Sequence, residues 1–377
     1  MRCLLGRRRL PWPLHHLLPL ALALVLLLLI TLLQLGPIEE WVQSPGGEEF
    51  GEMANPGVPL RPAAGTGWAP GSFQLPNLGA CTGSRPVFLV TLVASSPGHR
   101  HQRQAIRDSW GSLAEAAGRR VRTLFALGLP ATPREARLLE AEAQRHGDLV
   151  QGLFTDTYLN LTLKTLMVLD WVREHCPDAR FVLKADDDVF VNVRALVTHL
   201  AALSPPESEP EGHPRSRSVA EPDLYLGRIH ASVRVERDPD SPYYVPEAAY
   251  PAPTYPRYCS GTAYVLSRGA AAKVLAAAHR LPLVRVEDAF IGMCARAAGL
   301  SPTPSARMAG AQRLYPHRCC LRRAFSSHHV SPAELSALWL QVEEGGECGT
   351  LQGLAARLIC NSVSLLDQLR YHWAGAR

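Results

Sequence analysis

The fold of this chain is decided by the stretch Phe181-Val182-Leu183-Lys184-Ala185-Asp186-Asp187-Asp188-Val189-Phe190-Val191-Asn192. Its apolar flanks predict a buried strand that enters and leaves a short acidic turn. Three adjacent carboxylates repel one another, so ionising all three in a partly buried place is costly without a cation. Hard divalent ions such as Mg²⁺ and Mn²⁺ prefer carboxylate oxygen. The stretch therefore predicts a metal–diphosphate site at the carboxyl end of a strand, where open α/β sheets bind ligands.

A solvated acidic turn is the alternative for three aspartates in a row. The apolar residues on both sides argue against it, because an exposed turn rarely sits so tightly between two apolar runs. A calcium hand is a poor match, because the residues that follow lack the spaced acids and the central glycine of that loop.

The amino-acid composition is typical of a folded protein and lacks the strong positive charge of a nucleic-acid-binding protein. The chain has 377 residues, 47% of them hydrophobic, and a net charge of +5. Four of those charges are Arg2, Arg7, Arg8 and Arg9, and the remaining 35 basic side chains face 34 acidic ones. Because the rest is nearly neutral, we expect no nucleic-acid partner.

The segment Leu17 to Leu35 is apolar and long enough to cross a bilayer as a helix. Basic residues precede it and Glu39 and Glu40 follow, so the positive-inside rule predicts a cytosolic N-terminus. A cleaved signal peptide is the alternative, but the apolar core is long and no clear cleavage site follows. We expect a cytosolic tail at 1–16, a transmembrane signal-anchor at 17–35, a flexible stem at 36–80, and a luminal domain at 81–377.

Eight cysteines follow the predicted anchor, and an even number in an oxidising lumen predicts disulfides. Their pairing stays open, and a zinc site is the rival, although no Cys-x-x-Cys pair supports it. Asn160 begins the Asn-Leu-Thr sequon and is a candidate glycosylation site; capping of the following helix is the alternative reading.

Apolar runs alternate with amphipathic segments after residue 86, which predicts a parallel or mixed α/β sheet with crossover helices. The expected strands include residues 87–94, 121–127, 149–154 and 262–266. The expected helices cover residues 100–117, 133–146, 161–175, 268–278, 288–298, 332–342 and 351–359. Residues 203–222 are rich in Pro, Glu, Ser and Arg and are expected to form a mobile surface insertion.

Further groups could carry chemistry. Arg103 and Arg107 share a helical face and could pair with phosphate, or form a solvated basic face. Glu287-Asp288 in an apolar frame could supply a general base or simply favour a helix start. Tyr258 to Tyr264 could stack a sugar or form a packed turn. His328, in a histidine pair, could complete a metal shell or lie on the surface.

In their order, these motifs resemble the β-1,3-galactosyltransferase family of Golgi enzymes. The resemblance rests on residues 103–110, 124–128, 146–149, 156–165, 181–188, 255–267 and 287–288. It implies a GT-A fold: a mixed, mainly parallel sheet flanked by helices, after the anchor and stem. It also implies a UDP-sugar donor, Mn²⁺ as cofactor and a type II protein of the Golgi membrane.

The resemblance also implies roles for particular residues. Asp288 matches the catalytic base, and Asp186, Asp188 and His328 match metal or diphosphate contacts. Further residues are expected on the donor side, namely Arg103, Arg107, Lys184 and Asp187. The acceptor or sugar pocket is expected to comprise Tyr258, Gly261, Tyr264 and Glu287.

The expected reaction is inverting transfer of galactose from UDP-galactose to the 3-hydroxyl of an acceptor glycan on protein or lipid. A β-1,3-N-acetylglucosaminyl- or N-acetylgalactosaminyltransferase of the same fold is the nearest alternative. A non-catalytic Golgi partner protein is another, although such a protein would be expected to lose the acids or the base, and this chain keeps both.

Overall fold

The computed structural model describes residues 21–28, 71–204, 222–310, 317–344, 346, 348–356 and 358–360. Residues 21–28 are helical, whereas the rest of the predicted anchor, the tail and nearly all of the stem lie outside these ranges. Most of the predicted insertion at 203–222 lies outside them as well. Within the described ranges, the structure contains no helix with the length and apolar character needed to cross a bilayer.

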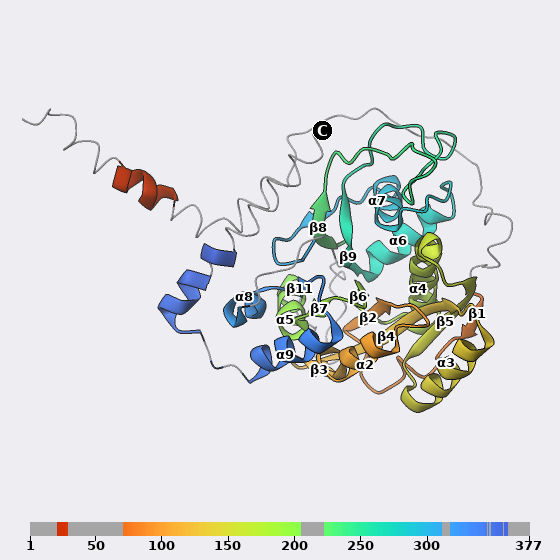
Figure 1. Cartoon of the computed structure of the whole chain (residues 1–377), viewed down its shortest axis with the longest axis horizontal. Coiled ribbons are helices and arrows are strands. Elements are labelled where there is room, and N and C mark those ends of the chain that lie inside the picture. Colours follow the sequence, from red (N-terminus) through yellow and green to blue (C-terminus); the bar gives the residue numbers. More distant parts are fainter. Residues whose placement is uncertain are drawn as a thin grey trace, which may run out of the picture.

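A nine-stranded mixed sheet forms the centre of the described structure (Figure 1). Four neighbouring strands are parallel, namely β5 (Leu149–Thr155), β4 (Arg119–Leu129), β2 (Leu89–Ala94) and β6 (Phe181–Asp186). Antiparallel pairing then adds β9 (Tyr258–Ser267) and β8 (Tyr225–His230), and β10 (Thr303–Pro304) extends that edge in parallel. Two short strands pair antiparallel with this sheet, β1 (Phe73–Leu75) with β5 and β3 (Glu115–Ala116) with β4. The predicted mixed, mainly parallel sheet is therefore confirmed.

Helices cover both faces of the sheet. The predicted helices α3 (Pro133–His146), α4 (Leu161–His175) and α6 (Arg268–Ala278) are confirmed at the expected residues. The helix expected at 288–298 is α7 (Glu287–Ala297), and the one expected at 332–342 is α9 (Pro332–Glu343). Residues 350–356 and 358–360 are helical, as expected for that region. The other helices are α2 (Arg100–Arg107), α5 (Val193–Leu203) and α8 (Arg318–Arg323).

The prediction of one helix over residues 100–117 is wrong beyond Arg107. The α-helix stops there, a 3₁₀ turn follows at Trp110–Ser112, and β3 then forms a hairpin with β4. The hairpin turn consists of Ala117 and Gly118, both with positive φ, as two-residue hairpin turns of this kind require. A pattern search for a helical period does not detect a turn that depends on backbone dihedrals.

Side chains alternate in direction along each strand, so the hydrophobic core is divided between the two faces of the sheet. On β2, Val90 and Leu92 belong to the core cluster that includes residues of α4, α6 and α7, whereas Leu89 and Val93 belong to the one that includes residues of α2, α5 and α9. Because successive strand residues point to opposite faces, a strand buried on both sides must be apolar throughout. This explains why the sequence of β2 is apolar except for Thr91.

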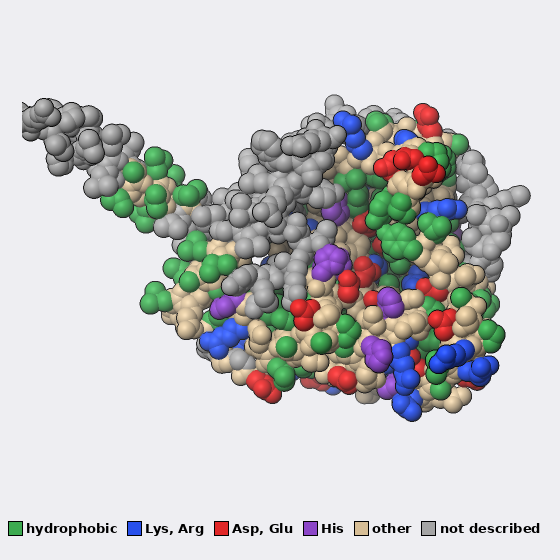
Figure 2. Space-filling model, in the orientation of Figure 1, with side chains coloured by type: hydrophobic (Ala, Val, Ile, Leu, Met, Phe, Trp, Pro, Cys, Tyr) green, Lys and Arg blue, Asp and Glu red, His purple; other side chains and the backbone are tan. Residues whose placement is uncertain are grey.

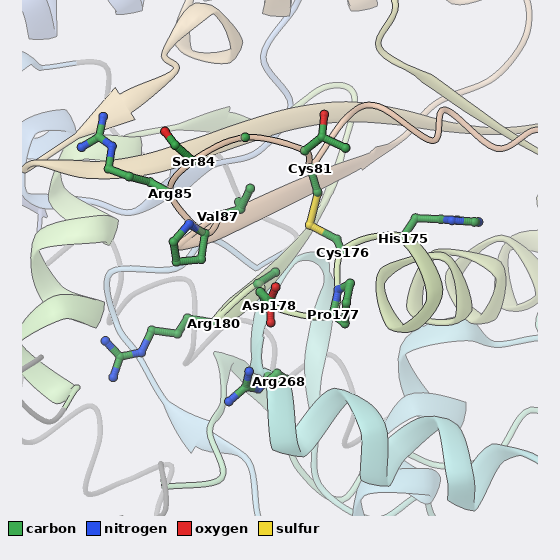
Figure 3. A pocket seen from close by; sticks show the side chains of 14 residues that line it. Cys81, Ser84, Arg85, Val87, His175, Cys176, Pro177, Asp178, Arg180 and Arg268 are labelled. Atoms are coloured by element: carbon green, nitrogen blue, oxygen red, sulfur yellow. A yellow bond between two sulfur atoms is a disulfide. The ribbon is translucent and has the colours of Figure 1, made fainter. Parts of the chain in front are cut away.

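Three disulfides join described residues: Cys81 to Cys176, Cys319 to Cys348, and Cys320 to Cys360. The expectation of disulfides is confirmed, but Cys259 and Cys294 are free and buried inside the core. The Cys81–Cys176 bond borders a pocket of about 640 Å³ that Arg85, Arg180 and Arg268 also line (Figure 3). That pocket adjoins the residues that precede β2 and β6, so it lies at the edge opposite the acidic turn.

The two free cysteines among the described residues should resist modification in the native protein. Burial raises the pKa of the Cys259 and Cys294 thiols, and the thiolate is the reactive form. We expect alkylation of the folded protein to leave both unlabelled and alkylation after unfolding without reductant to label both. Peptide mapping by mass spectrometry should also recover the three disulfide-linked peptide pairs. Labelling of either thiol in the native state, or a crosslink between Cys259 and Cys294, would contradict this arrangement.

Candidate active site

The acidic turn lies where three strands meet. Strand β6 ends at Asp186, beside Ala94 at the end of β2, and Ala185 pairs with Ala263 of the antiparallel β9. Acidic side chains and histidines gather in a hollow near the middle of the face that Figure 2 shows. The carboxyl ends of the parallel strands therefore carry the site, as ligand binding in open α/β sheets predicts.

The Lys184 side chain lies beneath the acidic turn and links it to β9 and α7. Its buried ammonium donates hydrogen bonds to Asp186 Oδ1, at 2.6 Å, and to the carbonyl oxygen of Gly261. Glu287 Oε2 lies 3.7 Å from the same nitrogen. Burial alone would lower the pKa of Lys184, but the charges of Asp186 and Glu287 outweigh it and raise that pKa. Lys184 is therefore held charged, and it lies under the site with 3% of its side chain exposed.

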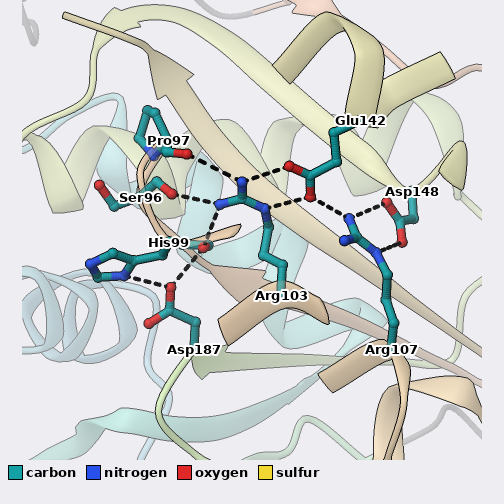
Figure 4. Close-up of polar contacts among 9 residues, drawn as sticks. Ser96, Pro97, His99, Arg103, Arg107, Glu142, Asp148 and Asp187 are labelled. Carbon is teal, nitrogen blue, oxygen red and sulfur yellow. Dashed lines mark hydrogen bonds and ion pairs between the residues drawn. The ribbon is translucent and has the colours of Figure 1, made fainter. Parts of the chain in front are cut away.

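Asp187 points towards the loop that follows β2. Its Oδ2 accepts a hydrogen bond from Ser95 Oγ at 2.6 Å and lies 2.9 Å from His99 Nδ1 (Figure 4). The hydrogen bond to Asp187 raises the pKa of His99, which favours an imidazolium beside the carboxylate. These contacts fix the middle aspartate away from Asp188, so the adjacent acids diverge.

Asp188 and two histidines form the metal-type cluster of the described residues. Asp188 Oδ2 lies 3.3 Å from His328 Nε2 and 3.7 Å from His329 Nδ1. One ligand atom from each of the three residues lies within 4.8 Å of the others. The structure brings Asp188 and His328 together and leaves Asp186 outside this group, and metal binding by the predicted ligands stays a prediction.

Sequence reasoning missed His329. Adjacent residues in extended backbone point to opposite sides, so two neighbouring histidines would not be expected to face one carboxylate. His329 has a φ of +54°, and the two imidazole rings stack with centroids 3.9 Å apart. Strand β11 (Ser326–Ser327) pairs with β7 (Phe190–Val191) and brings both rings to the acidic turn. No local signal in the sequence indicates the positive φ.

Asp288 lies at the amino-terminal end of α7, close to Gly261 on β9. Its Oδ2 accepts a hydrogen bond from the Gly261 N–H at 3.0 Å, and its Oδ1 accepts one from Ala289 N–H at 2.9 Å. A Cβ at position 261 would lie 3.1 Å from Glu287 Oε2 and 3.3 Å from Asp288 Oδ2. The absence of a side chain at Gly261 therefore lets β9 approach the acid pair closely.

The other expected acceptor residues form the floor of the site. Tyr258, Tyr264 and Glu287 are buried, with 5%, 1% and 4% of their surfaces exposed. Glu287 Oε1 accepts hydrogen bonds from Tyr264 Oη and Thr165 Oγ1, both at 2.8 Å. Burial raises the pKa of Glu287. Acceptor contact by these three side chains stays a prediction, and this conformation offers almost none of their surface for it.

Arg103 and Arg107, expected on the donor side, belong to a buried ion network (Figure 4). The Arg103 side chain is fully buried and donates to both oxygens of Glu142, to Ser95 Oγ and to two carbonyl oxygens. Arg107 donates to Glu142 and to Asp148. Since every nitrogen of Arg103 is already bonded, donor contact by this guanidinium stays a prediction that the present conformation does not provide.

Asn160 occupies the residue before α4. Its Nδ2 donates to the Thr155 carbonyl oxygen at 2.9 Å, and its side chain makes no capping bond to α4. The sequon hydroxyl, Thr162 Oγ1, is buried and donates to the Val284 carbonyl oxygen at 2.9 Å. The side-chain cap offered as an alternative is therefore not formed, and glycosylation of Asn160 stays a prediction.

Fold and site together define an α/β protein with a carboxylate–imidazole cluster and a second carboxylate at the carboxyl edge of its sheet. The Galactosyltransferase family model matches residues 101–306. β-1,3-Galactosyltransferase 4 of Rattus norvegicus is 41% identical over 335 residues, covering 83% of this chain and 88% of the relative. The human protein of that name is 40% identical over 341 residues, with the same two shares. This chain therefore belongs to the Galactosyltransferase family.

More distant matches include transferases of another sugar. The acetylgalactosaminyl-O-glycosyl-glycoprotein β-1,3-N-acetylglucosaminyltransferase of Mus musculus is 37% identical over 272 residues, covering 69% of this chain and 66% of the relative. Among solved structures, the WbbM bifunctional glycosyltransferase covers 60% of this chain and 40% of its own, with a TM-score of 0.31 and 11% identity. A similarity this low supports no conclusion about this chain.

Glu142, on α3, should contribute strongly to the stability of the protein, because its carboxylate pairs with both Arg103 and Arg107 of α2. Burial would raise the pKa of Glu142, but Arg103 and Arg107 outweigh it and hold that pKa below its ordinary value. We expect Glu142→Gln to lower the free energy of unfolding by about 3–5 kcal/mol, because two buried arginines lose a shared counter-charge. Urea denaturation at neutral pH measures this change.

The pH dependence gives an independent check. A carboxyl whose pKa is lower in the folded state stabilises the protein above its unfolded pKa, and that contribution is lost as pH falls through the folded pKa. The stability difference between wild type and Glu142→Gln should therefore shrink in acid. Glu140→Gln, at an exposed position of the same helix, is the matched control. Equal stability of the two variants would contradict the structural role of Glu142.

Proposed function

We propose that this protein transfers galactose from UDP-galactose to the 3-hydroxyl of an acceptor sugar and forms a β-1,3 linkage with inversion at the anomeric carbon. The observation that carries the proposal is the link between two acidic groups through Lys184, which donates to Asp186 in the acidic turn and to the carbonyl oxygen of Gly261, whose own N–H donates to Asp288. The relatives named β-1,3-galactosyltransferase, at about 40% identity over most of both chains, support galactose as the transferred sugar.

Asp288 is proposed to accept the proton from the acceptor 3-hydroxyl while that oxygen attacks the donor anomeric carbon from the face opposite UDP. A general base of this kind contributes a factor of about 10²–10⁴. Its two oxygens already accept backbone N–H bonds, which fix the carboxylate orientation at the helix start. A lone pair on each oxygen remains for the acceptor hydroxyl.

The residues present fit a divalent cation such as Mn²⁺. Asp188 offers a carboxylate oxygen, and His328 and His329 offer imidazole nitrogens, on one side of the turn. Carboxylates suit hard divalent ions, and imidazole is tolerated by the first-row metals. A bound cation supplies neutralisation of the charge that grows on the departing diphosphate. Asp186, which accepts a hydrogen bond from Lys184, is proposed as a further ligand of the same cation.

The setting is proposed to be the Golgi lumen. The apolar segment at 17–35 supports a type II anchor in the Golgi membrane, and the three disulfides support an oxidising compartment. The strand order, with antiparallel β9 inserted between β6 and β8, supports a GT-A type domain. Acceptor glycans on protein or lipid are both compatible with this placement.

Transfer of N-acetylglucosamine is the second candidate, and the relative from Mus musculus named for that donor supports it. A panel of UDP-sugars with methyl glycosides as acceptors separates the two. Acceptor-stimulated release of UDP from UDP-galactose supports the proposal, whereas release from UDP-N-acetylglucosamine in its place supports the alternative. Absence of release from every donor would count against both, and against a catalytic role.

Asp288→Asn should abolish most turnover and leave donor binding intact. The amide keeps the size of the carboxylate but accepts no proton at neutral pH, so we expect kcat to fall by about 10²–10⁴. The dissociation constant for UDP with Mn²⁺ should stay unchanged in calorimetry. Asp178→Asn, an exposed site at the opposite edge, serves as control. Turnover within a few-fold of wild type would remove Asp288 from the role.

Asp188→Asn should weaken the binding of UDP in a metal-dependent way. Loss of the anionic ligand lowers cation affinity, so the difference in UDP affinity with and without Mn²⁺ should shrink by about tenfold or more. His328→Gln and His329→Gln should shift the Mn²⁺ concentration for half-maximal binding in the same direction. If the Mn²⁺ dependence of UDP binding persists in full in all three variants, the cluster does not hold the cation.

A further inference from the structure

An exposed aromatic pair stands beside the candidate active site, on two segments far apart in the chain. Tyr158 belongs to the 3₁₀ turn that precedes α4, and Tyr243 belongs to the segment between β8 and β9. Their rings meet edge to face with centroids 6.3 Å apart, and their hydroxyl oxygens lie 3.5 Å apart. Among the described tyrosines these two are the exposed ones, at 61% and 51%.

Two contacts anchor the Tyr158 side to the segment that carries the proposed base. Thr162 Oγ1 donates to the Val284 carbonyl oxygen at 2.9 Å, and Thr165 Oγ1 donates to Glu287 Oε1 at 2.8 Å. Both threonines lie on the first turns of α4, directly after Tyr158. The start of α4 and the start of α7 are thus joined, so Tyr158 is held near Asp288.

The Tyr243 side is held by its own polar contacts. Arg237 donates to the carbonyl oxygens of Val245, Tyr250 and Ala252 at 2.6–2.9 Å, which closes the segment around one guanidinium. Val245 is buried, and the rings of Tyr250 and Tyr255 stack beneath it with centroids 5.4 Å apart. Tyr243 is therefore displayed on an ordered support.

The electrostatics of Tyr158 agree with this placement. Partial burial and the contact with Tyr243 raise the pKa of Tyr158, and the charges of Asp288 and Asp186 act in the same direction. The other aromatic residues near the base, Tyr258 and Tyr264, are buried and cannot offer a ring face.

We propose that Tyr158 and Tyr243 form the acceptor-binding surface of this enzyme and stack against the C–H face of the acceptor pyranose. An exposed tyrosine ring presents an apolar face with a polar hydroxyl at its edge, and a sugar presents an apolar C–H face with hydroxyls at its edge. The phenol hydroxyls match that polar edge. This inference rests on the proposed transfer to a sugar 3-hydroxyl, because it places the acceptor and not the donor.

The test uses the full-length chain purified in mild detergent, with UDP-galactose, Mn²⁺ and methyl glycosides of galactose, N-acetylglucosamine and N-acetylgalactosamine. Methyl aglycones are chosen so that only the sugar can stack. We expect Tyr158→Ala and Tyr243→Ala each to raise the acceptor KM by about tenfold, with donor KM and UDP binding unchanged. Tyr158→Phe keeps the ring and should stay within about twofold of wild type.

Leu138→Ala removes another exposed apolar side chain, on α3 and away from the site, and serves as control. An unchanged acceptor KM in both alanine variants, a rise in donor KM, or a Tyr158→Phe variant as impaired as Tyr158→Ala would each overturn the proposal. Failure of the proposed function gives a different result, because wild type itself would then release no UDP from UDP-galactose in response to any acceptor.

Discussion

A single buried ammonium holds the two halves of the site together. Lys184 Nζ contacts Asp186 on its own strand, the Gly261 carbonyl oxygen on β9 and, at 3.7 Å, Glu287 on α7. A charge in this environment is costly unless several partners compensate it, and here the partners come from three separate elements. Its position beneath the acidic turn therefore fixes the distance between that turn and the helix that bears Asp288. Two carboxylates, those of Asp186 and Glu287, face this one ammonium, and the surplus of negative charge is what a divalent cation would neutralise.

The sheet, most of its helices and the place of the site could be predicted because each depends on local pattern. Strand β6 is apolar before Asp186 except for Lys184, and this pattern indicated a buried strand that ends at the acidic turn. Helix α3 begins at a Thr132 cap followed by Pro133 and ends at Gly147 with a φ of +60°, all of which are local signals. The hairpin at Ala117-Gly118 and the left-handed His329 could not be predicted, because both depend on backbone dihedrals that tertiary contacts impose.

The solvent exposure of individual polar side chains is the property that the sequence predicted least well. Arginine and tyrosine suit phosphate and sugar in principle, yet Arg103 is fully buried against Glu142 and Tyr264 is buried against Glu287. In both cases the polar end of the side chain is hydrogen-bonded to a carboxylate that is far away in the sequence. Tyr158 belongs to the motif at 156–165 but was given no role there, and its ring is exposed in a single 3₁₀ turn before α4. Long-range pairing decides which polar side chains remain available to a ligand.

The adjacent acids Glu287 and Asp288 show how one helix start can separate two roles. Glu287 is buried, its pKa is raised by burial, and its oxygens already face Tyr264, Thr165 and Lys184. Asp288, one residue later, is only partly buried, and its carboxylate accepts hydrogen bonds from the Gly261 and Ala289 N–H groups. Neighbouring carboxyls in different environments can take different functions, and a substrate hydroxyl needs an accessible one. The difference in burial supports the proposed division, in which Glu287 supports the site and Asp288 accepts the proton.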